Sequence, residues 1–216
     1  MPYNQKPRIY AVATTHLDTS WSWDLETTLR EYLPKTLTEN FTLFEKYPDY
    51  VFSFEGAYRY ELTEEYFPAL FEKLKEYIKK GRWHVSGSAY ENGDVNIPSP
   101  EALIRNILYG TRYFREAFGK RSEDIFLPDC FGFGWALPSV AAHANLKGFT
   151  TQKLVWSSAY GVPFDLGVWE GPDGGRIFAS LDAGDYNRSL KTVRRKGSVA
   201  RKLRSNTRKY GLRFTF

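Results

Sequence analysis

The amino-acid sequence predicts an α/β fold built on a mostly parallel β-sheet. Two observations support this: short apolar runs alternate with long helical patterns, and no internal repeat or low-complexity linker divides the chain. A β-α-β-α order joins successive strands through right-handed crossovers, in a sheet that is either open or rolled into a barrel. With 216 residues, 42% hydrophobic and 17% aromatic, the chain can bury a core as one compact unit.

Six short segments have the composition of buried strands, because they are rich in apolar, β-branched and aromatic residues. RIYAVAT is the first of them, and a further segment, YGLRFTF, resembles the beginning of another strand. The six expected strands span residues 8–14, 50–56, 82–89, 124–129, 148–156 and 175–182, and the further segment spans 210–216.

Helical patterns separate the expected strands. The clearest helix has Ser99 as a good N-cap, Pro100 in its first turn and Gly119 at its end. In another helix Pro68 interrupts the pattern, so we expect the regular helix to begin near it. The expected helices span 25–46, 61–81, 99–119 and 137–148, and the buried stripe expected on the third comprises Leu103, Ile104, Ile107, Leu108 and Phe114.

The positive charge is concentrated near the C-terminus. The formal net charge is +5, but residues 188–216 carry eleven Lys or Arg and no acid, which leaves 19 basic and 25 acidic residues elsewhere, a balance of −6. A basic segment can bind nucleic acid or anionic surfaces, but a charge run is more often a solvated helix face. We therefore expect neither nucleic acid nor a membrane as a partner.

Targeting signals are not visible in the sequence. It has no run of 18 apolar residues, so no transmembrane helix is predicted. The start, MPYNQKPRIYAV, lacks a basic-then-apolar leader. This predicts a cytoplasmic protein if the start is native, and a periplasmic or secreted one if a leader was removed. Cys130 is the single cysteine, which excludes an internal disulfide, and the sequence does not define the oligomeric state.

Acidic residues follow the carboxyl end of most of the expected strands. In parallel α/β folds functional groups gather at these ends. One Asp after a strand is usually only an N-cap, but several acids with a His among them favour a cationic ligand. The residues at these ends are His16, Asp18, Glu55, Glu91, Asp94, Asp129, Asp182 and Asp185.

His16 and Asp18 are the first candidate pair. In an extended chain residues i and i+2 point to the same side. An imidazole nitrogen and a carboxylate oxygen together suit Zn²⁺ or another divalent cation. The H-x-D pattern alone is a weak signal, since most such pairs are incidental. A third ligand must come from elsewhere, and Asp129 is the natural candidate.

The segment LPDCFGFGWALP, residues 127–138, is the second candidate element. Its glycines allow tight turns and close approach of a ligand, and its aromatic rings can line a pocket. A capped turn above an aromatic core explains the same residues equally well. Trp21, Trp23 and Trp156 also fall just past strand ends, where indole rings favour carbohydrate or simply belong to the core.

Taken together, these motifs resemble glycoside hydrolase family 38 α-mannosidases, most closely those of the bacterial type. THLDTSWSWD at 15–24 resembles the opening H-x-D-x-x-W signature of that family. The segments FEGAYRYELTEEYFP, SGSAYENGDVNIPSPEALIRNILYG, LPDCFGFGWALPS and GFTTQKLVW follow in the family's order. The similarity extends over roughly residues 8–187 and is less distinct over 188–216.

The resemblance implies a seven-stranded (β/α) barrel of the glycoside hydrolase and deacetylase type, incomplete in this chain. Residues 1–216 would be its N-terminal part, with 188–216 leading into a continuation. It also implies hydrolysis of terminal α-mannosidic bonds in a mannose-containing glycan, by a retaining mechanism that depends on Zn²⁺ or another divalent cation. His16 and Asp18 would be metal ligands, Asp129 both ligand and nucleophile, and the substrate-binding residues Trp21, Asp94, Lys153 and Trp156.

Two departures from the family pattern bear on this expectation. Thr14 stands where many members have the first His of H-x-H-x-D, but that His is not usually a ligand. The family's fourth ligand, a His, and its general acid/base, an Asp, would lie beyond Phe216. We therefore expect the chain by itself to be weakly active or inactive.

Two other classes of function are compatible with the same residues. A metal-dependent deacetylase or amidohydrolase on a similar barrel would use the His and Asp ligands with an activated water. A non-catalytic module would bind carbohydrate through its aromatic residues, or nucleic acid through the basic segment. The LPDCFGFG block favours the mannosidase, and the acidic body disfavours nucleic acid.

Overall fold

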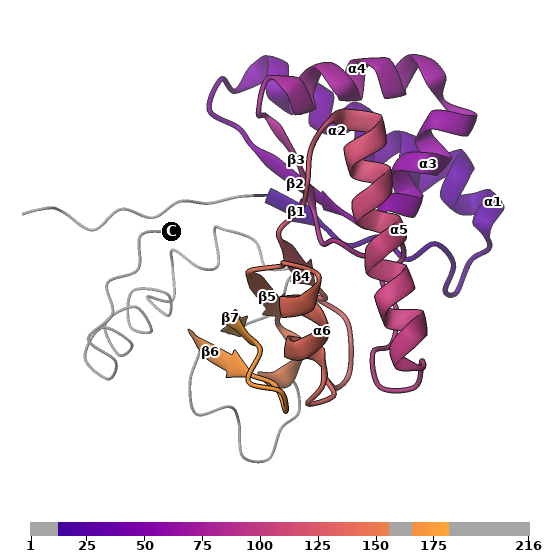
Figure 1. The fold of residues 1–216 in the computed structure, drawn as a ribbon. Coiled ribbons are helices and arrows are strands. Elements are labelled where there is room, and N and C mark those ends of the chain that lie inside the picture. The colour runs from indigo at the N-terminus through magenta and orange to yellow at the C-terminus, as the bar shows by residue number, and fades with distance from the viewer. Residues whose placement is uncertain (1–12, 156–165, 182–216) are drawn as a thin grey trace, which may run out of the picture.

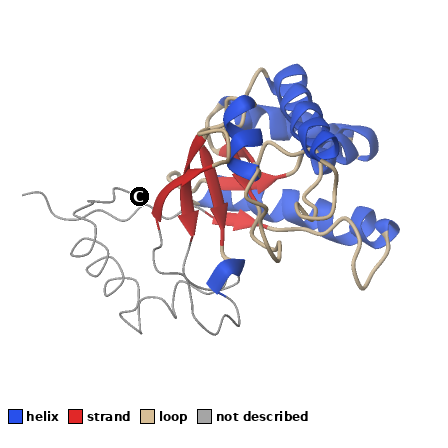
Figure 2. Ribbon diagram, turned by 60° about the horizontal axis from the view of Figure 1, so that its bottom comes forward, coloured by secondary structure: helices blue, strands red, loops and turns tan. Residues whose placement is uncertain are grey.

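The computed structural model describes residues 13–155 and 166–181, which form an α/β fold with two small sheets (Figures 1 and 2). The first sheet is wholly parallel and has the order β1-β2-β3. Its residues are enriched in aromatic side chains on the face that helices cover. The strands of this sheet are β1 (Ala13–Thr15), β2 (Phe52–Glu55) and β3 (Trp83–Ser86).

The second sheet has the order β4-β5-β7-β6. Strands β4, β5 and β7 are parallel, whereas β6 pairs with β7 in the antiparallel sense. The antiparallel strand was not expected from the sequence. The strands of this sheet are β4 (Asp124–Phe126), β5 (Gly148–Thr151), β6 (Leu166–Glu170) and β7 (Arg176–Leu181).

The expected barrel is wrong. The described strands form two separate sheets rather than one closed sheet, and one of them contains an antiparallel pair. At the junction, Gly87 directly after β3 has φ +63°, which takes the chain out of the extended conformation. Only single hydrogen bonds then reach β4, including Ser88 N–H to the Asp124 carbonyl at 2.8 Å, and no ladder joins β3 to β4.

The helices confirm most of the expected positions and correct their bounds. The pattern at 61–81 forms two helices, because Phe67 precedes Pro68 and leaves the helical region at φ −136°, ψ 58°. The helices are α1 (Leu25–Thr27), the π-helix η1 (Thr28–Tyr32), α2 (Leu33–Lys46), α3 (Ala57–Tyr66), α4 (Pro68–Lys79), α5 (Pro100–Phe118), α6 (Leu137–His143) and the 3₁₀ helix η2 (Lys153–Val155).

Helix α5 runs beside both sheets and links their cores (Figure 1). Its Ser99 cap accepts a hydrogen bond from Ala102 N–H at 3.2 Å, and Gly119 ends it in the left-handed conformation. Phe114 belongs to the core of the first sheet and Ile107 to that of the second. Two members of the expected buried stripe, Ile104 and Leu108, are instead more than half exposed.

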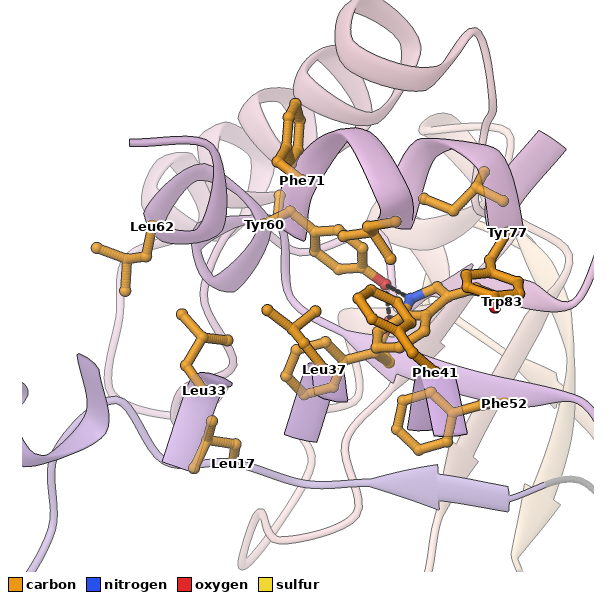
Figure 3. Close-up of a cluster of buried hydrophobic side chains, with 14 of the residues drawn as sticks. Leu17, Leu33, Leu37, Phe41, Phe52, Tyr60, Leu62, Phe71, Tyr77 and Trp83 are labelled. Atoms are coloured by element: carbon orange, nitrogen blue, oxygen red, sulfur yellow. Dashed lines mark hydrogen bonds between the residues drawn. The ribbon is translucent and has the colours of Figure 1, made fainter. Parts of the chain in front are cut away.

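The core of the first sheet is aromatic. Phe52 on β2 and Trp83 on β3 face helices α2, α3 and α4 (Figure 3), and Phe54 belongs to the same buried cluster. The polar atoms within it are paired: Trp83 Nε1 donates to Tyr60 Oη at 2.9 Å, and Tyr60 Oη donates to the Phe54 carbonyl at 2.7 Å. A second core packs α6 against β4, β5 and β7.

Several expectations concern residues outside the described ranges. They are the strand at 210–216, the basic segment 188–216, Asp182, Asp185 and Trp156. Within the described ranges, no helix combines the length and apolar character needed to cross a membrane.

Candidate metal centre and active site

Three of the expected site residues meet although they come from different sheets. His16 and Asp18 follow β1 of the first sheet, and Asp129 follows β4 of the second. Strand β4 ends at Phe126, so Asp129 lies in the loop after the strand rather than at its last position. One ligand atom from each of the three side chains lies within 4.8 Å of the others.

The distances within this group suit a divalent cation. His16 Nε2 lies 3.2 Å from Asp18 Oδ1 and 3.9 Å from Asp129 Oδ2. Ligands ~2.0–2.2 Å from a tetrahedral Zn²⁺ lie ~3.4 Å apart, so only small movements would be needed. One imidazole nitrogen and two carboxylate oxygens are also a donor set that Zn²⁺ accepts.

His16 is fixed by Glu55 on the side away from the two aspartates. His16 Nδ1 is hydrogen-bonded to Glu55 Oε1, and Glu55 is fully buried at the end of β2. Burial alone would lower the pKa of His16, but the hydrogen bond and charge of Glu55, together with Asp18, raise it above its ordinary value. For Glu55, burial raises the pKa, whereas His16 and Arg59 act to lower it.

Asp129 has a second cationic neighbour. Lys153 Nζ forms an ion pair with Asp129 Oδ1, and the Lys153 side chain is almost wholly buried. The ammonium also lies over the Phe131 ring, 4.7 Å from its centroid. The two carboxylate oxygens of Asp129 are therefore divided, with Oδ1 toward Lys153 and Oδ2 toward His16.

A cavity of about 160 Å³ opens onto this group. Asp94 lines it and accepts hydrogen bonds from the backbone N–H groups of Asn96 at 2.6 Å and Ile97 at 2.8 Å. Cys130 lines it too; its thiol lies 3.1 Å from the Gly93 carbonyl, and burial raises its pKa to about 12. The thiol is thus protonated at neutral pH, which argues against Cys130 as a nucleophile.

A larger hollow, of about 440 Å³, lies between the ends of α4 and α5. Its ionisable lining residues are Lys75, Lys79 and Lys120, so it offers no ligand for a cation. The smaller cavity is the one lined by the three candidate ligands.

Trp21, one of the expected substrate-binding tryptophans, lies outside the cavity lining described above. Trp21 is 79% exposed and packs edge-on against Trp23, with ring centroids 5.9 Å apart. It is not among the residues that line the cavity. Trp156 lies outside the described residues.

Sequence reasoning missed the polar network behind His16. Arg59 on α3 is buried and donates from Nη2 to Glu91 Oε1 at 2.7 Å. Glu55 and Glu91 had been noted only as acids after strands. The available signal was an arginine four residues after a strand-end acid, in the run EGAYR.

Carboxylates and a histidine gathered at strand ends around a cavity form a site of the kind that glycoside hydrolases use. Comparison with known sequences identifies the group more closely. Residues 6–212 match the Glycosyl hydrolases family 38 N-terminal domain, and the chain therefore belongs to glycoside hydrolase family 38.

Individual relatives agree with this assignment. The chain is 35% identical over 181 residues to Alpha-mannosidase G of Dictyostelium discoideum, and 33% identical over 177 residues to Alpha-mannosidase 2C1 of Mus musculus. These matches cover 83% and 82% of the chain, but the chain spans only 17% of the length of either relative. Among solved structures, an alpha-mannosidase from Enterococcus faecalis V583 superposes with a TM-score of 0.70 at 25% identity, covering 80% of this chain and 20% of that one.

Proposed function

We propose that this protein hydrolyses terminal α-mannosidic bonds of mannose-containing glycans by a metal-dependent retaining mechanism. The observation that carries the proposal is the meeting of His16, Asp18 and Asp129 beside one cavity. The proposal is supported by the chain's membership of family 38 and by its similarity to proteins named as alpha-mannosidases. Because the chain spans a small part of those relatives, the activity is proposed for the enzyme to which these residues contribute.

Zn²⁺ is the cation proposed for the site, with other divalent ions as alternatives. His16 would bind it through Nε2, and Asp18 and Asp129 through their carboxylates. When bound, the cation supplies positive charge that balances the acids and orients sugar hydroxyls. Binding also requires the imidazole to be neutral and the carboxylates ionised, so it releases protons.

Asp129 is proposed as the nucleophile. One of its carboxylate oxygens bonds to the anomeric carbon as the bond from that carbon to the leaving oxygen breaks, and the leaving oxygen takes up a proton. Water then cleaves the glycosyl ester with a second inversion, which gives net retention. The ammonium of Lys153 stabilises the negative charge that Asp129 needs for attack.

The substrate contacts are proposed from the same cavity. Asp94 accepts two backbone hydrogen bonds, so it is positioned as an acceptor for sugar hydroxyls rather than as a proton donor. Lys153 and Trp21 are further proposed contacts, together with Trp156. The proton donor is proposed to be a residue outside those described around this cavity, so we expect weak turnover of unactivated substrates by this chain.

An activated substrate tests the proposal without relying on that donor. Dinitrophenolate leaves without a proton, so the Zn²⁺-loaded 216-residue chain should release it from 2,4-dinitrophenyl α-mannoside above the uncatalysed rate. Chelation with EDTA and the Asp129→Asn substitution should each abolish this excess. Release of acetate from N-acetylated chitobiose, or turnover that survives Asp129→Asn, would instead favour the deacetylase or remove Asp129 from its role.

A further inference from the structure

Glu55 is a buried carboxylate whose Oε1 is hydrogen-bonded to a candidate metal ligand, His16. It lies at the end of β2, and its side chain is completely inaccessible. Moving a carboxylate out of water is costly unless it is paired and hydrogen-bonded. Hydrophobic residues of similar size would fill this position at lower cost, so the retention of an acid there calls for a function.

The two ring nitrogens of His16 face different partners. Its Nδ1 faces Glu55, and its Nε2 faces Asp18 at 3.2 Å and Asp129 at 3.9 Å. When neutral, an imidazole carries one N–H group and one lone pair. A carboxylate on Nδ1 favours the proton at that nitrogen, which leaves the lone pair of Nε2 directed into the candidate metal group.

The network around Glu55 also holds the loop that carries both ligands. Arg59 Nε donates to the Leu17 carbonyl at 2.5 Å, between the two ligand residues. Glu91 receives Arg59 Nη2 at 2.7 Å and the Thr19 hydroxyl at 2.6 Å. Positions 16, 17 and 19 are therefore each fixed by a group from another part of the chain.

Gly56 allows Arg59 to reach this position. It has φ +77°, and a Cβ there would lie 2.3 Å from Arg59 Nη1. The residue directly after Glu55 is therefore shaped to admit the guanidinium. The Gly56 backbone and the Arg59 side chain therefore both contribute to fixing the loop after β1.

We infer that Glu55 is the positioning residue of the metal centre: by accepting Nδ1–H of His16 it fixes the tautomer and ring orientation that present Nε2 to the cation. This inference rests on the proposed metal site. It goes further by assigning a role to a residue that makes no contact with the cation. Arg59 and Glu91 assist by holding the backbone on which His16 and Asp18 are carried.

Metal affinity is the first test. Co²⁺ is titrated into the 216-residue chain and followed by its visible absorption. Glu55→Gln preserves the size of the side chain but removes the charge, and loss of such a partner typically weakens metal binding about 10–100-fold. We expect at least a tenfold weaker affinity, with partial recovery in Glu55→Asp. The matched control is Glu61→Gln, which removes a carboxylate on α3 whose hydrogen bond is to Tyr90 rather than to His16.

A second measurement reads the tautomer of His16 in the unsubstituted protein and needs a variant only for assignment. The chain has three histidines, which makes the imidazole ¹⁵N spectrum assignable with His16→Gln as reference. At a pH where His16 is neutral, we expect Nδ1 to be protonated and Nε2 to be unprotonated. The opposite tautomer would overturn the inference.

The outcomes separate this inference from the function on which it rests. If the unsubstituted chain fails to bind Co²⁺, the metal centre and the inference fall together. If it binds Co²⁺ and Glu55→Gln binds equally well, or if Glu61→Gln weakens binding as much, only the inference is overturned. Tenfold weakening confined to Glu55→Gln, with the Nδ1–H tautomer, supports it.

Discussion

At His16 and at Asp129, a strand pairing brings a partner to each candidate ligand. Thr15 pairs with Phe54 in the β1–β2 ladder, so the following residues, His16 and Glu55, emerge side by side. In the β4–β5 ladder Phe126 pairs with Thr150, and Asp129 and Lys153 continue the same offset in the loops beyond. Register therefore sets the chemistry of both side chains.

Asp173 offers a pH-dependent prediction. Its carboxylate accepts hydrogen bonds from Ser139 Oγ at 2.5 Å and Gly175 N–H at 2.9 Å and contacts His143, which hold its pKa at about 2. A depressed carboxyl pKa contributes stability that is complete above the unfolded value of about 3.9 and disappears as the pH falls through about 2.

The urea midpoints of the unsubstituted chain and of Asp173→Asn measure this contribution. The substituted chain should have the lower midpoint at pH 5, and the two midpoints should converge as the pH approaches 2. A difference that stays constant over this range would show that ionisation of Asp173 is not responsible.

The sequence identified His16, Asp18 and Asp129 because each follows an apolar run, a pattern that is local. It could not identify their partners, because only strand register brings Glu55 next to His16 and Lys153 next to Asp129. Arg59 was missed for a related reason: within a helix its sequence looks solvent-exposed, and only the packing of α3 against the loop after β1 buries it.

Among the secondary-structure elements, α5 contributes side chains to both hydrophobic cores. Gly110 lies where the helix crosses the segment leading to Glu91 and Asp94. A Cβ at Gly110 would lie 2.3 Å from the Ser88 carbonyl oxygen and 2.5 Å from Tyr90 N. Because both are backbone atoms, no side-chain rotation could relieve the overlap.

Gly110→Ala is therefore expected to destabilise the protein by about 1–3 kcal/mol, even though alanine favours helix formation. Urea unfolding followed by tryptophan fluorescence provides the measurement. Gly93→Ala is the matched control, since a Cβ there meets nothing within 4 Å. Equal stability of Gly110→Ala and the control would contradict the close packing.

The ends of α5 were predictable because capping is local: Ser99, Pro100 and Gly119 act within one turn. Its buried stripe was only partly predictable. Ile104 and Leu108 fit the helical period but are more than half exposed among the described residues. Periodicity indicates which residues share a helix face, and tertiary packing decides how much of that face is covered.

For the molecule as a whole, the alternation of strands and helices was predictable, but the closure of the sheet was not. Closure depends on which distant strand edges pair, and no local pattern encodes that. Two details oppose it here: the positive φ of Gly87 at the end of β3, and the antiparallel β6, whose short LGVWE sequence contains a strand-weakening glycine. The site nevertheless forms where the loops of the two sheets meet.

A crystal of the protein grown with Zn²⁺ and measured at the zinc absorption edge would test this joint site most directly. The account predicts one anomalous peak ~2.0–2.2 Å from His16 Nε2 and from carboxylate oxygens of Asp18 and Asp129. A peak elsewhere, or none beside these three residues at saturating Zn²⁺, would contradict it.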